Sequence, residues 1–328
     1  MATSEQIKAL IRSHSEGDNS RFDSIALQMA AQAAHHGHAK LADELRLLID
    51  NAKEKGSEVT KSFNVTNIRQ PQGELAGLLS VVYPEARFSS LILTEQNIAR
   101  LNRIIIEQRQ KDKLAEHGLL PRRKILLYGP PGTGKTLTAS ALAGELHLPL
   151  YSIQLDGLIT KFMGETAAKL RLIFDHIGKV HGVYFFDEFD AIGAHRTSQN
   201  DVGEIRRVLN SFLQFLEQSH TDSIILAATN NLELLDKALF RRFDDVIEYT
   251  LPDKKLAIEA FKNRLAIMGI KDLDYEKLAV ASAGFSFAEI SNACNDAIKS
   301  IILNEIPNKL TTSIMLLHLE ERRNSIIK

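Results

Sequence analysis

One stretch of the chain has the composition of a phosphate-binding loop. Its residues fit the pattern G-x-x-x-x-G-K-[ST] and are Gly129, Pro130, Pro131, Gly132, Thr133, Gly134, Lys135 and Thr136. Glycines let the backbone N–H groups of such a loop turn towards phosphate oxygens at the positive end of a helix dipole. Lys135 would then contact the β- and γ-phosphates, and the Thr136 hydroxyl would ligate Mg2+. A glycine-rich turn between a strand and a helix, without a ligand, is the alternative.

A second motif places two carboxylates at the end of an apolar run. Val183–Phe186 is followed directly by Asp187 and Glu188. Asp187 would hold Mg2+ through water molecules, and Glu188 would orient or deprotonate the attacking water. Alone this ending is weak evidence, but beside a phosphate-binding loop it indicates a magnesium-dependent hydrolase. We expect Asp190 to cap the turn that follows or to remain solvated.

The elements that must position these motifs alternate along the chain. Between residues 121 and 253, short apolar runs are separated by amphipathic helical patterns. Continuous apolar strands of this kind predict an α/β fold with a parallel sheet that helices cover on both faces. The predicted strands are Ile125–Tyr128, Leu150–Ile153, Val183–Phe186, Ser223–Leu226 and Val246–Tyr249.

Composition and charge exclude several classes of protein. The 40 basic and 41 acidic residues leave a net charge of −1, which argues against a general basic footprint for nucleic acid or anionic membrane. The single cysteine, Cys294, excludes an intrachain disulfide and a cysteine-built metal cluster. Because we find neither a secretory signal nor an apolar run of membrane-spanning length, we expect a cytoplasmic protein without a membrane partner.

The order and spacing of the motifs resemble those of the AAA ATPases, in the branch of katanin, spastin and related protein remodellers. The similarity extends over roughly residues 88–302 and includes Ala227–Asn230 and Leu235–Asp244. It implies an αβα nucleotide-binding domain with a helical lid. It also implies a hexameric ring that binds ATP and Mg2+ and hydrolyses ATP to remodel, unfold or thread protein substrates.

The resemblance also assigns roles to residues outside the first two motifs. Asn230 matches the polar sensor that positions the lytic water near the γ-phosphate. Arg241 and Arg242 match the paired arginine fingers that reach the nucleotide of the neighbouring subunit. Such fingers neutralise charge on the transferred phosphoryl group, so hydrolysis would require assembly. Two solvated surface arginines are the alternative.

A further match lies after the second predicted strand. Phe162 and Met163 stand where the family has a pore loop that grips the substrate polypeptide, and a ring beside a flexible thioether suits many side chains. Ordinary packing of a hydrophobic pair is the alternative. A second pore-facing segment is expected at residues 193–203. Phe287 replaces a glycine of the lid motif, near the expected place of adenine and ribose.

The domain organisation follows from these matches. We expect a small bundle of three helices that binds a partner over residues 1–52, and a linker over residues 53–87. The large ATPase domain would cover residues 88–253, and the helical lid residues 254–328.

More than one function is compatible with the motifs. The chain resembles throughout some bacterial AAA ATPases that are paired with a subtilisin-like serine protease in two-component anti-phage defence modules. A nucleic-acid motor or loader is an alternative, which the neutral charge disfavours. A nucleotide-gated scaffold with slow turnover is another alternative.

Overall fold

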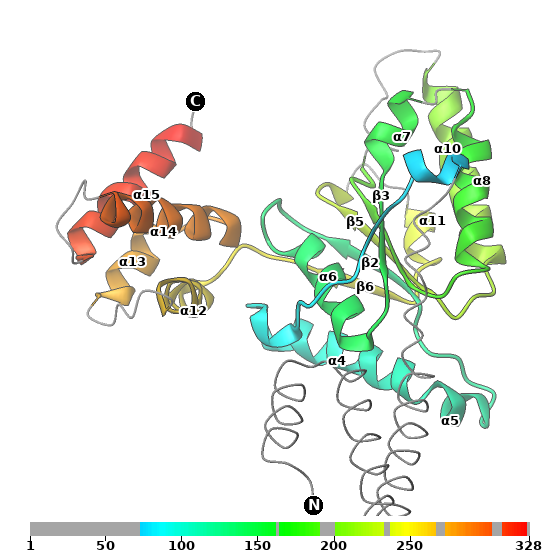
Figure 1. The fold of residues 1–328 in the computed structure, drawn as a ribbon, viewed down its shortest axis with the longest axis horizontal. Helices are drawn as coiled ribbons and strands as arrows, with labels where there is room; N and C mark the ends of the chain where they lie inside the picture. The colour runs from blue at the N-terminus through cyan, green and yellow to red at the C-terminus, as the bar shows by residue number, and fades with distance from the viewer. Residues whose placement is uncertain are drawn as a thin grey trace, which may run out of the picture. The chain divides into compact units, whose positions relative to one another are not determined.

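A computed structural model describes a large part of the chain (Figure 1). The chain divides into two units, Met1–Arg69 and Gln70–Lys328, and all described residues belong to the second unit. The predicted N-terminal bundle, residues 1–52, lies outside the described residues. The described residues are 73–161, 164–190, 201–232, 237–266, 273–303 and 310–326.

A six-stranded sheet with the order β1-β3-β4-β5-β2-β6 forms the centre of the larger domain. Neighbouring strands are parallel, except that β1 is antiparallel to β3. All the runs predicted as strands form strands, and the mainly parallel sheet is confirmed. The strands are β1 Ser80–Val82, β2 Lys124–Tyr128, β3 Leu150–Gln154, β4 Val183–Asp187, β5 Ile224–Thr229 and β6 Asp245–Glu248.

Helices connect the strands and continue beyond the last of them. The helices around the sheet are the 3-10 turns η1 Gly73–Gly77 and η2 Phe88–Ser90, and α4 Glu95–Arg109, α5 Lys111–Ala115, α6 Lys135–Leu146, α7 Leu155–Lys161, α8 Thr166–Ile177, α10 Asp201–Gln218 and α11 Lys237–Phe240. The C-terminal helices are α12 Lys254–Leu265, α13 Tyr275–Ala281, α14 Phe287–Ile302 and α15 Thr312–Ile326. No helix in the described part of the chain is long and apolar enough to cross a bilayer.

Side chains of the central strands alternate between two apolar clusters, one on each face of the sheet. In β2, Ile125 and Leu127 pack with residues of α4 and α6, whereas Leu126 packs with residues of α8 and α10. The two pairs of helices lie on opposite sides of the sheet in Figure 1. Because both faces are buried, the strands are apolar at nearly every position, which is why they were recognisable in the sequence.

The segment predicted as a linker differs from the prediction in its described part. Within residues 73–87, η1 is followed by buried Leu78 and Leu79 and then by β1, in which Val81 pairs with Tyr151 of β3. This strand has 3 residues, too few to produce a recognisable alternation in the sequence. The sheet therefore begins earlier in the chain than the sequence indicates.

The C-terminal helices form a cluster of their own, as the sequence predicts. Helices α12 to α15 share one apolar core, which contains the buried thiol of Cys294. Three of these helices begin at residues whose side-chain oxygens accept a backbone N–H group, namely Asp253, Asp274 and Ser286. These caps explain where the helices start.

Candidate active site

The phosphate-binding loop connects the end of β2 to the first residue of α6. Gly129 has a φ of 140°, and a Cβ atom there would collide with the carbonyl oxygen of Tyr249. Only glycine fits this close approach of the β6 end to the loop. The Lys135 side chain folds back over the loop, where its Nζ donates to the carbonyl oxygens of Gly129 at 2.7 Å and Pro130 at 2.9 Å.

The Lys135 ammonium is a buried positive charge at the centre of the loop. Burial lowers the pKa of Lys135 from its ordinary value, and the negative charges of Asp187 and Asp190 oppose this shift. Lys135 is 7% exposed. A cation held in this way, beside the N-terminus of a helix, is suited to bind phosphate oxygens.

Two oxygen donors for a divalent cation meet beside the loop. The Thr136 hydroxyl lies 3.3 Å from Asp187 Oδ2, although the two residues are 51 positions apart. Mg2+ prefers hard oxygen ligands and usually takes only one or two from the protein, keeping water and substrate phosphates for the rest. The pair therefore fits Mg2+. The described residues include no group of three or more His, Cys, Asp and Glu that could hold a metal by themselves.

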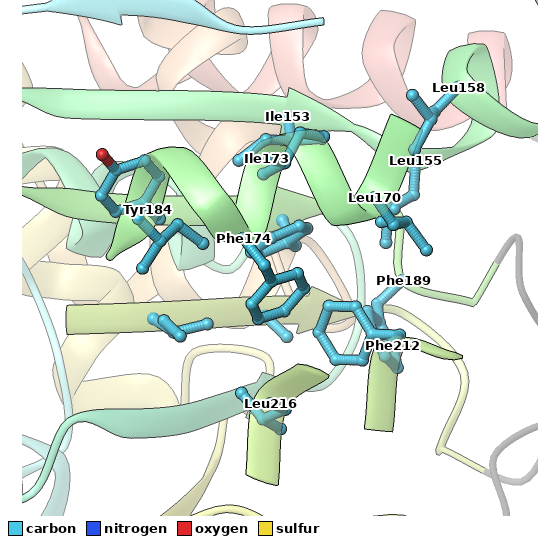
Figure 2. Packing of buried hydrophobic residues seen from close by; sticks show 14 of the residues in the cluster. Ile153, Leu155, Leu158, Leu170, Ile173, Phe174, Tyr184, Phe189, Phe212 and Leu216 are labelled. Carbon is cyan, nitrogen blue, oxygen red and sulfur yellow. The ribbon is translucent and has the colours of Figure 1, made fainter. Parts of the chain in front are cut away.

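Glu188 lies directly after β4 in a strained backbone conformation. Its φ of 54° is in the left-handed region, which residues other than glycine seldom adopt. The strain is explained by the next residue, Phe189, whose N–H donates to the Ala228 carbonyl at 2.8 Å. The Phe189 ring is buried against Phe212, with ring centroids 4.8 Å apart (Figure 2). The exposed Glu188 side chain is thus held at the sheet edge by an anchor in the core.

The ends of β4 and β5 are joined by a carboxylate that sequence reasoning missed. Asp190 Oδ1 accepts the Asn230 N–H at 3.3 Å. The Thr229 hydroxyl has two acceptors for its one proton, Asp190 Oδ1 at 3.4 Å and the Asn231 carbonyl oxygen at 3.3 Å. Asp190 is therefore not simply solvated, and the turn that the sequence predicts it to cap lies outside the described residues. The signal for this contact is the adjacency of β4 and β5, which the sequence does not reveal.

Arg241 and Arg242 lie away from the phosphate-binding loop of their own chain. They come just before β6, which runs parallel to β2 with Asp245 opposite Ile125, so they lie at the edge where β2 begins. The loop follows the other end of β2, a strand of 5 residues. At a rise of about 3.3 Å per residue, the two ends are about 13 Å apart. The structure does not bring these arginines to their own chain's loop.

The turn that carries the arginines is held firmly. Asp244 Oδ2 accepts the N–H groups of Arg123 at 2.8 Å and Lys124 at 2.9 Å, and the Asp244 N–H donates to the Lys124 carbonyl at 2.7 Å. Arg242 forms an ion pair with Glu217 of α10. The conformation of this turn is therefore fixed by the same chain.

The first residue of β6, Asp245, is bound by two arginines. Asp245 forms ion pairs with Arg100 of α4 and with Arg122, the latter at 3.5 Å. These ion pairs extend the network from the turn to the start of β6.

The lid contacts the loop through the first turn of α14. The Ala288 N–H donates to the Gly132 carbonyl at 3.1 Å, and a Cβ atom on Gly132 would crowd the Ser286 hydroxyl. Ser286 and Glu289 form a capping box that fixes this helix start. Phe287 is partly buried against the lid's own apolar cluster. The ring expected beside adenine and ribose thus packs within the lid.

The predicted substrate-gripping pair, Phe162 and Met163, lies outside the described residues. The same holds for residues 193–200 of the expected second pore segment. The described neighbours of the pair are the end of α7 at Lys161 and Gly164, which has a φ of 88°.

Comparison with known proteins agrees with this arrangement. Residues 125–251 match the profile of the family described as "ATPase family associated with various cellular activities (AAA)". The "Uncharacterized AAA family ATPase y4kL" of Sinorhizobium fredii is 34% identical over 303 residues, which are 92% of this chain and 90% of that protein. A "Proteasome-activating nucleotidase" of Saccharolobus islandicus is 36% identical over 224 residues, 65% of this chain and 57% of the relative.

Two further similarities concern a longer protein and a solved structure. An "ATP-dependent zinc metalloprotease FtsH 4" of Sphaerobacter thermophilus is 37% identical over 224 residues, 65% of this chain but 34% of that protein. The crystal structure of the FIGL-1 AAA domain has a TM-score of 0.60 at 23% identity and covers 74% of this chain and 85% of that domain, which shows a common fold. With these similarities and the geometry above, the chain belongs to the AAA family of ATPases and is an ATP-hydrolysing enzyme.

Proposed function

We propose that the chain assembles into a hexameric ring in which two protomers share each hydrolysis site. One protomer binds ATP with its phosphate-binding loop, and Arg241 and Arg242 of its neighbour complete the site. The observation that carries this proposal is the position of the two arginines, at the edge of the sheet opposite their own loop. Since they are too far from that loop, arginines with a catalytic role must act on another chain.

Within one protomer, the proposed chemistry divides among a few residues. Lys135 binds the β- and γ-phosphates, while Thr136 and Asp187 hold Mg2+, which supplies charge neutralisation on the phosphates when bound. Glu188 orients or deprotonates the attacking water, and Asn230 positions that water near the γ-phosphate. Support comes from the 3.3 Å contact of Thr136 with Asp187 and from the fixed backbone around Glu188.

The proposed substrate is protein, which the ring remodels, unfolds or threads. The names of two relatives, a proteasome-activating nucleotidase and an ATP-dependent zinc metalloprotease, both refer to a protease. Phe162 and Met163 are proposed to grip the polypeptide in the pore, as in the katanin- and spastin-like branch. A cytoplasmic location is part of the same proposal.

A separate protease is the proposed partner. The sequence contains no His-Glu-x-x-His motif, the zinc-binding signature of metalloproteases. One relative has the name proteasome-activating nucleotidase. We propose that the partner is a subtilisin-like serine protease and that the pair belongs to a bacterial anti-phage defence module, on the resemblance described above.

Electron microscopy of the Glu188→Gln protein with ATP tests the assembly. We expect rings of six subunits, with polypeptide in the pore when a protein substrate is added. The matched control is Lys135→Ala, which should lose nucleotide and give fewer rings. Monomers under both conditions would contradict the proposal.

Two further experiments test the substrate and the partner separately. Phe162→Ala should abolish substrate processing while ATP turnover persists, and unchanged processing would show that this residue does not grip substrate.

The Glu188→Gln protein, used as bait in its own host's extract with ATP, should retain the subtilisin-like protease. Recovery of no protease would count against the partner but leave the ATPase proposal intact.

A further inference from the structure

Asp190 occupies a position between two strand ends that the proposed mechanism does not use. It follows β4 by three residues, and its Oδ1 atom accepts the Asn230 N–H at 3.3 Å. The Thr229 hydroxyl lies 3.4 Å from the same oxygen and 3.3 Å from the Asn231 carbonyl oxygen. A carboxylate from the β4 side thus binds the main chain of the residue that follows β5. Asn230 is the proposed sensor.

The residue before Asp190 is anchored in the core. This residue, Phe189, is 0% exposed and donates its N–H to the Ala228 carbonyl at 2.8 Å. Figure 2 shows the Phe189 ring beside Phe212, within the cluster that also includes Phe174 of α8. Asp190 is therefore fixed on its own side of the contact.

The turn around Asn230 is also held by a hydrogen bond. Thr229 is 0% exposed, and its hydroxyl oxygen accepts the Asn231 N–H at 3.2 Å. This bond closes a tight turn around Asn230, whose own N–H donates to Asp190 Oδ1. The orientation of the exposed Asn230 side chain depends on this backbone.

We infer that Asp190 is a positioning residue that holds Asn230 in its sensor orientation through the main-chain N–H group. The inference rests on the proposed function, because it assumes the role of Asn230 in hydrolysis. A different possibility is that Asp190 acts only by its charge on Lys135. The two roles make different demands on the side chain: positioning needs a hydrogen-bond acceptor, whereas the charge effect needs an ionised carboxylate.

A comparison of Asp190→Ala with Asp190→Asn separates these roles. Removing the acceptor should lower kcat by about 10- to 100-fold, the size of effect expected for a lost bond to a charged group. ATP affinity, measured with a fluorescent nucleotide, should stay within about threefold. Asp190→Asn retains an acceptor oxygen and should keep at least about one third of the wild-type kcat. The control Asp222→Ala, which removes an exposed carboxylate from an ion pair with Lys111, should leave kcat unchanged.

A double-mutant cycle with Asn230→Ala gives the direct test of coupling. In that background, Asp190→Ala should lower kcat by less than about threefold further, since there is no sensor left to position. If Asp190→Ala does not fold, Asp190→Leu, which has a similar size and no acceptor, takes its place in the cycle. Fully additive effects would overturn the inference, and so would equal losses in Asp190→Asn and Asp190→Ala. These outcomes are distinct from failure of the proposed function, in which Glu188→Gln would still hydrolyse ATP.

Discussion

At the carboxyl edge of the sheet, the phosphate-binding loop, Asp187 and Asn230 follow the ends of neighbouring parallel strands and lie within one chain. At the opposite, amino edge of the sheet, Arg241 and Arg242 lie in the turn before β6, which is hydrogen-bonded to the start of β2. The first region has Thr136 and Asp187 in contact, whereas the second lies beside the opposite end of β2. One sheet thus separates the groups that bind nucleotide from the arginines proposed to complete its hydrolysis.

The two regions also differ in how they are held. At the carboxyl edge, core packing of Phe189 forces a positive φ on Glu188. At the amino edge, backbone and ion-pair contacts of Asp244 and Asp245 fix the turn without strain in the described backbone. Substitutions in the two regions should therefore impair ATP hydrolysis in different ways. At the carboxyl edge they should remove catalytic groups of the same protomer, and at the amino edge they should remove groups that act on the neighbouring protomer.

The largest expected effect comes from the carboxyl edge. Glu188→Gln should lower kcat by about 10²- to 10⁴-fold, the range for loss of a general base, while ATP still binds. Lys135→Ala should lose turnover and most of the binding as well, because the buried ammonium is gone. Phosphate release and nucleotide titration measure the two quantities. Glu276→Gln, which changes an exposed lid carboxylate paired with Lys254, is the matched control and should behave like wild type.

A smaller effect is expected from the amino edge. Asp244→Ala removes the acceptor for two backbone N–H groups, those of Arg123 and Lys124, and should lower the free energy of unfolding by about 1 kcal/mol. Because the arginines lose their fixed turn, kcat should fall by about tenfold at unchanged ATP affinity. Thermal or denaturant unfolding and steady-state kinetics measure the two effects. A large loss of ATP affinity would mean that the two edges are not separate.

Much of this architecture could be predicted from the sequence because its signals are local. The loop pattern between an apolar run and a helix, and strands buried on both faces, are each contained in a few consecutive residues. Asp190 and Asn230 are 40 residues apart in the chain, and their contact depends on β4 and β5 being neighbours in the sheet. The sequence alone therefore could not predict it. Strand β1 was missed because it is so short, and the fixing of the arginine turn by Asp244 depends on the pairing of β6 with β2.

The link between the loop and the β6 end gives a smaller, structural test. The Tyr249 hydroxyl donates to Thr138 Oγ1 at 2.7 Å, in a buried bond between β6 and α6. Tyr249→Phe should lower the free energy of unfolding by about 1 kcal/mol or less, since the Thr138 hydroxyl still donates to Gly134. Thr138→Val should cost more, about 1 to 3 kcal/mol, because it leaves the tyrosine hydroxyl buried without its partner. Denaturant unfolding checks this order, and the reverse order would contradict it.

The smallest expected effect is in the lid, away from both edges. Burial raises the pKa of the Cys294 thiol to about 12 from 9.0. At pH 8 the folded protein should therefore be alkylated by iodoacetamide far more slowly than the unfolded chain. The stabilising contribution of the neutral thiol is complete below pH 9.0 and is lost as the pH rises from there to about 12. Fast alkylation of the native protein would show that the lid core is open.

Mixing two inactive variants tests most directly whether hydrolysis is shared between protomers. Lys135→Ala has no functional loop but intact arginines, whereas the double variant Arg241→Ala, Arg242→Ala has an intact loop but no arginines. Each alone should hydrolyse ATP at least about 10³-fold more slowly than wild type. Mixed in equal amounts, they should recover a substantial share of wild-type turnover, since arginines of the first complete sites of the second. Full activity of the arginine double variant alone, or no recovery in the mixture at concentrations where rings form, would contradict the shared site.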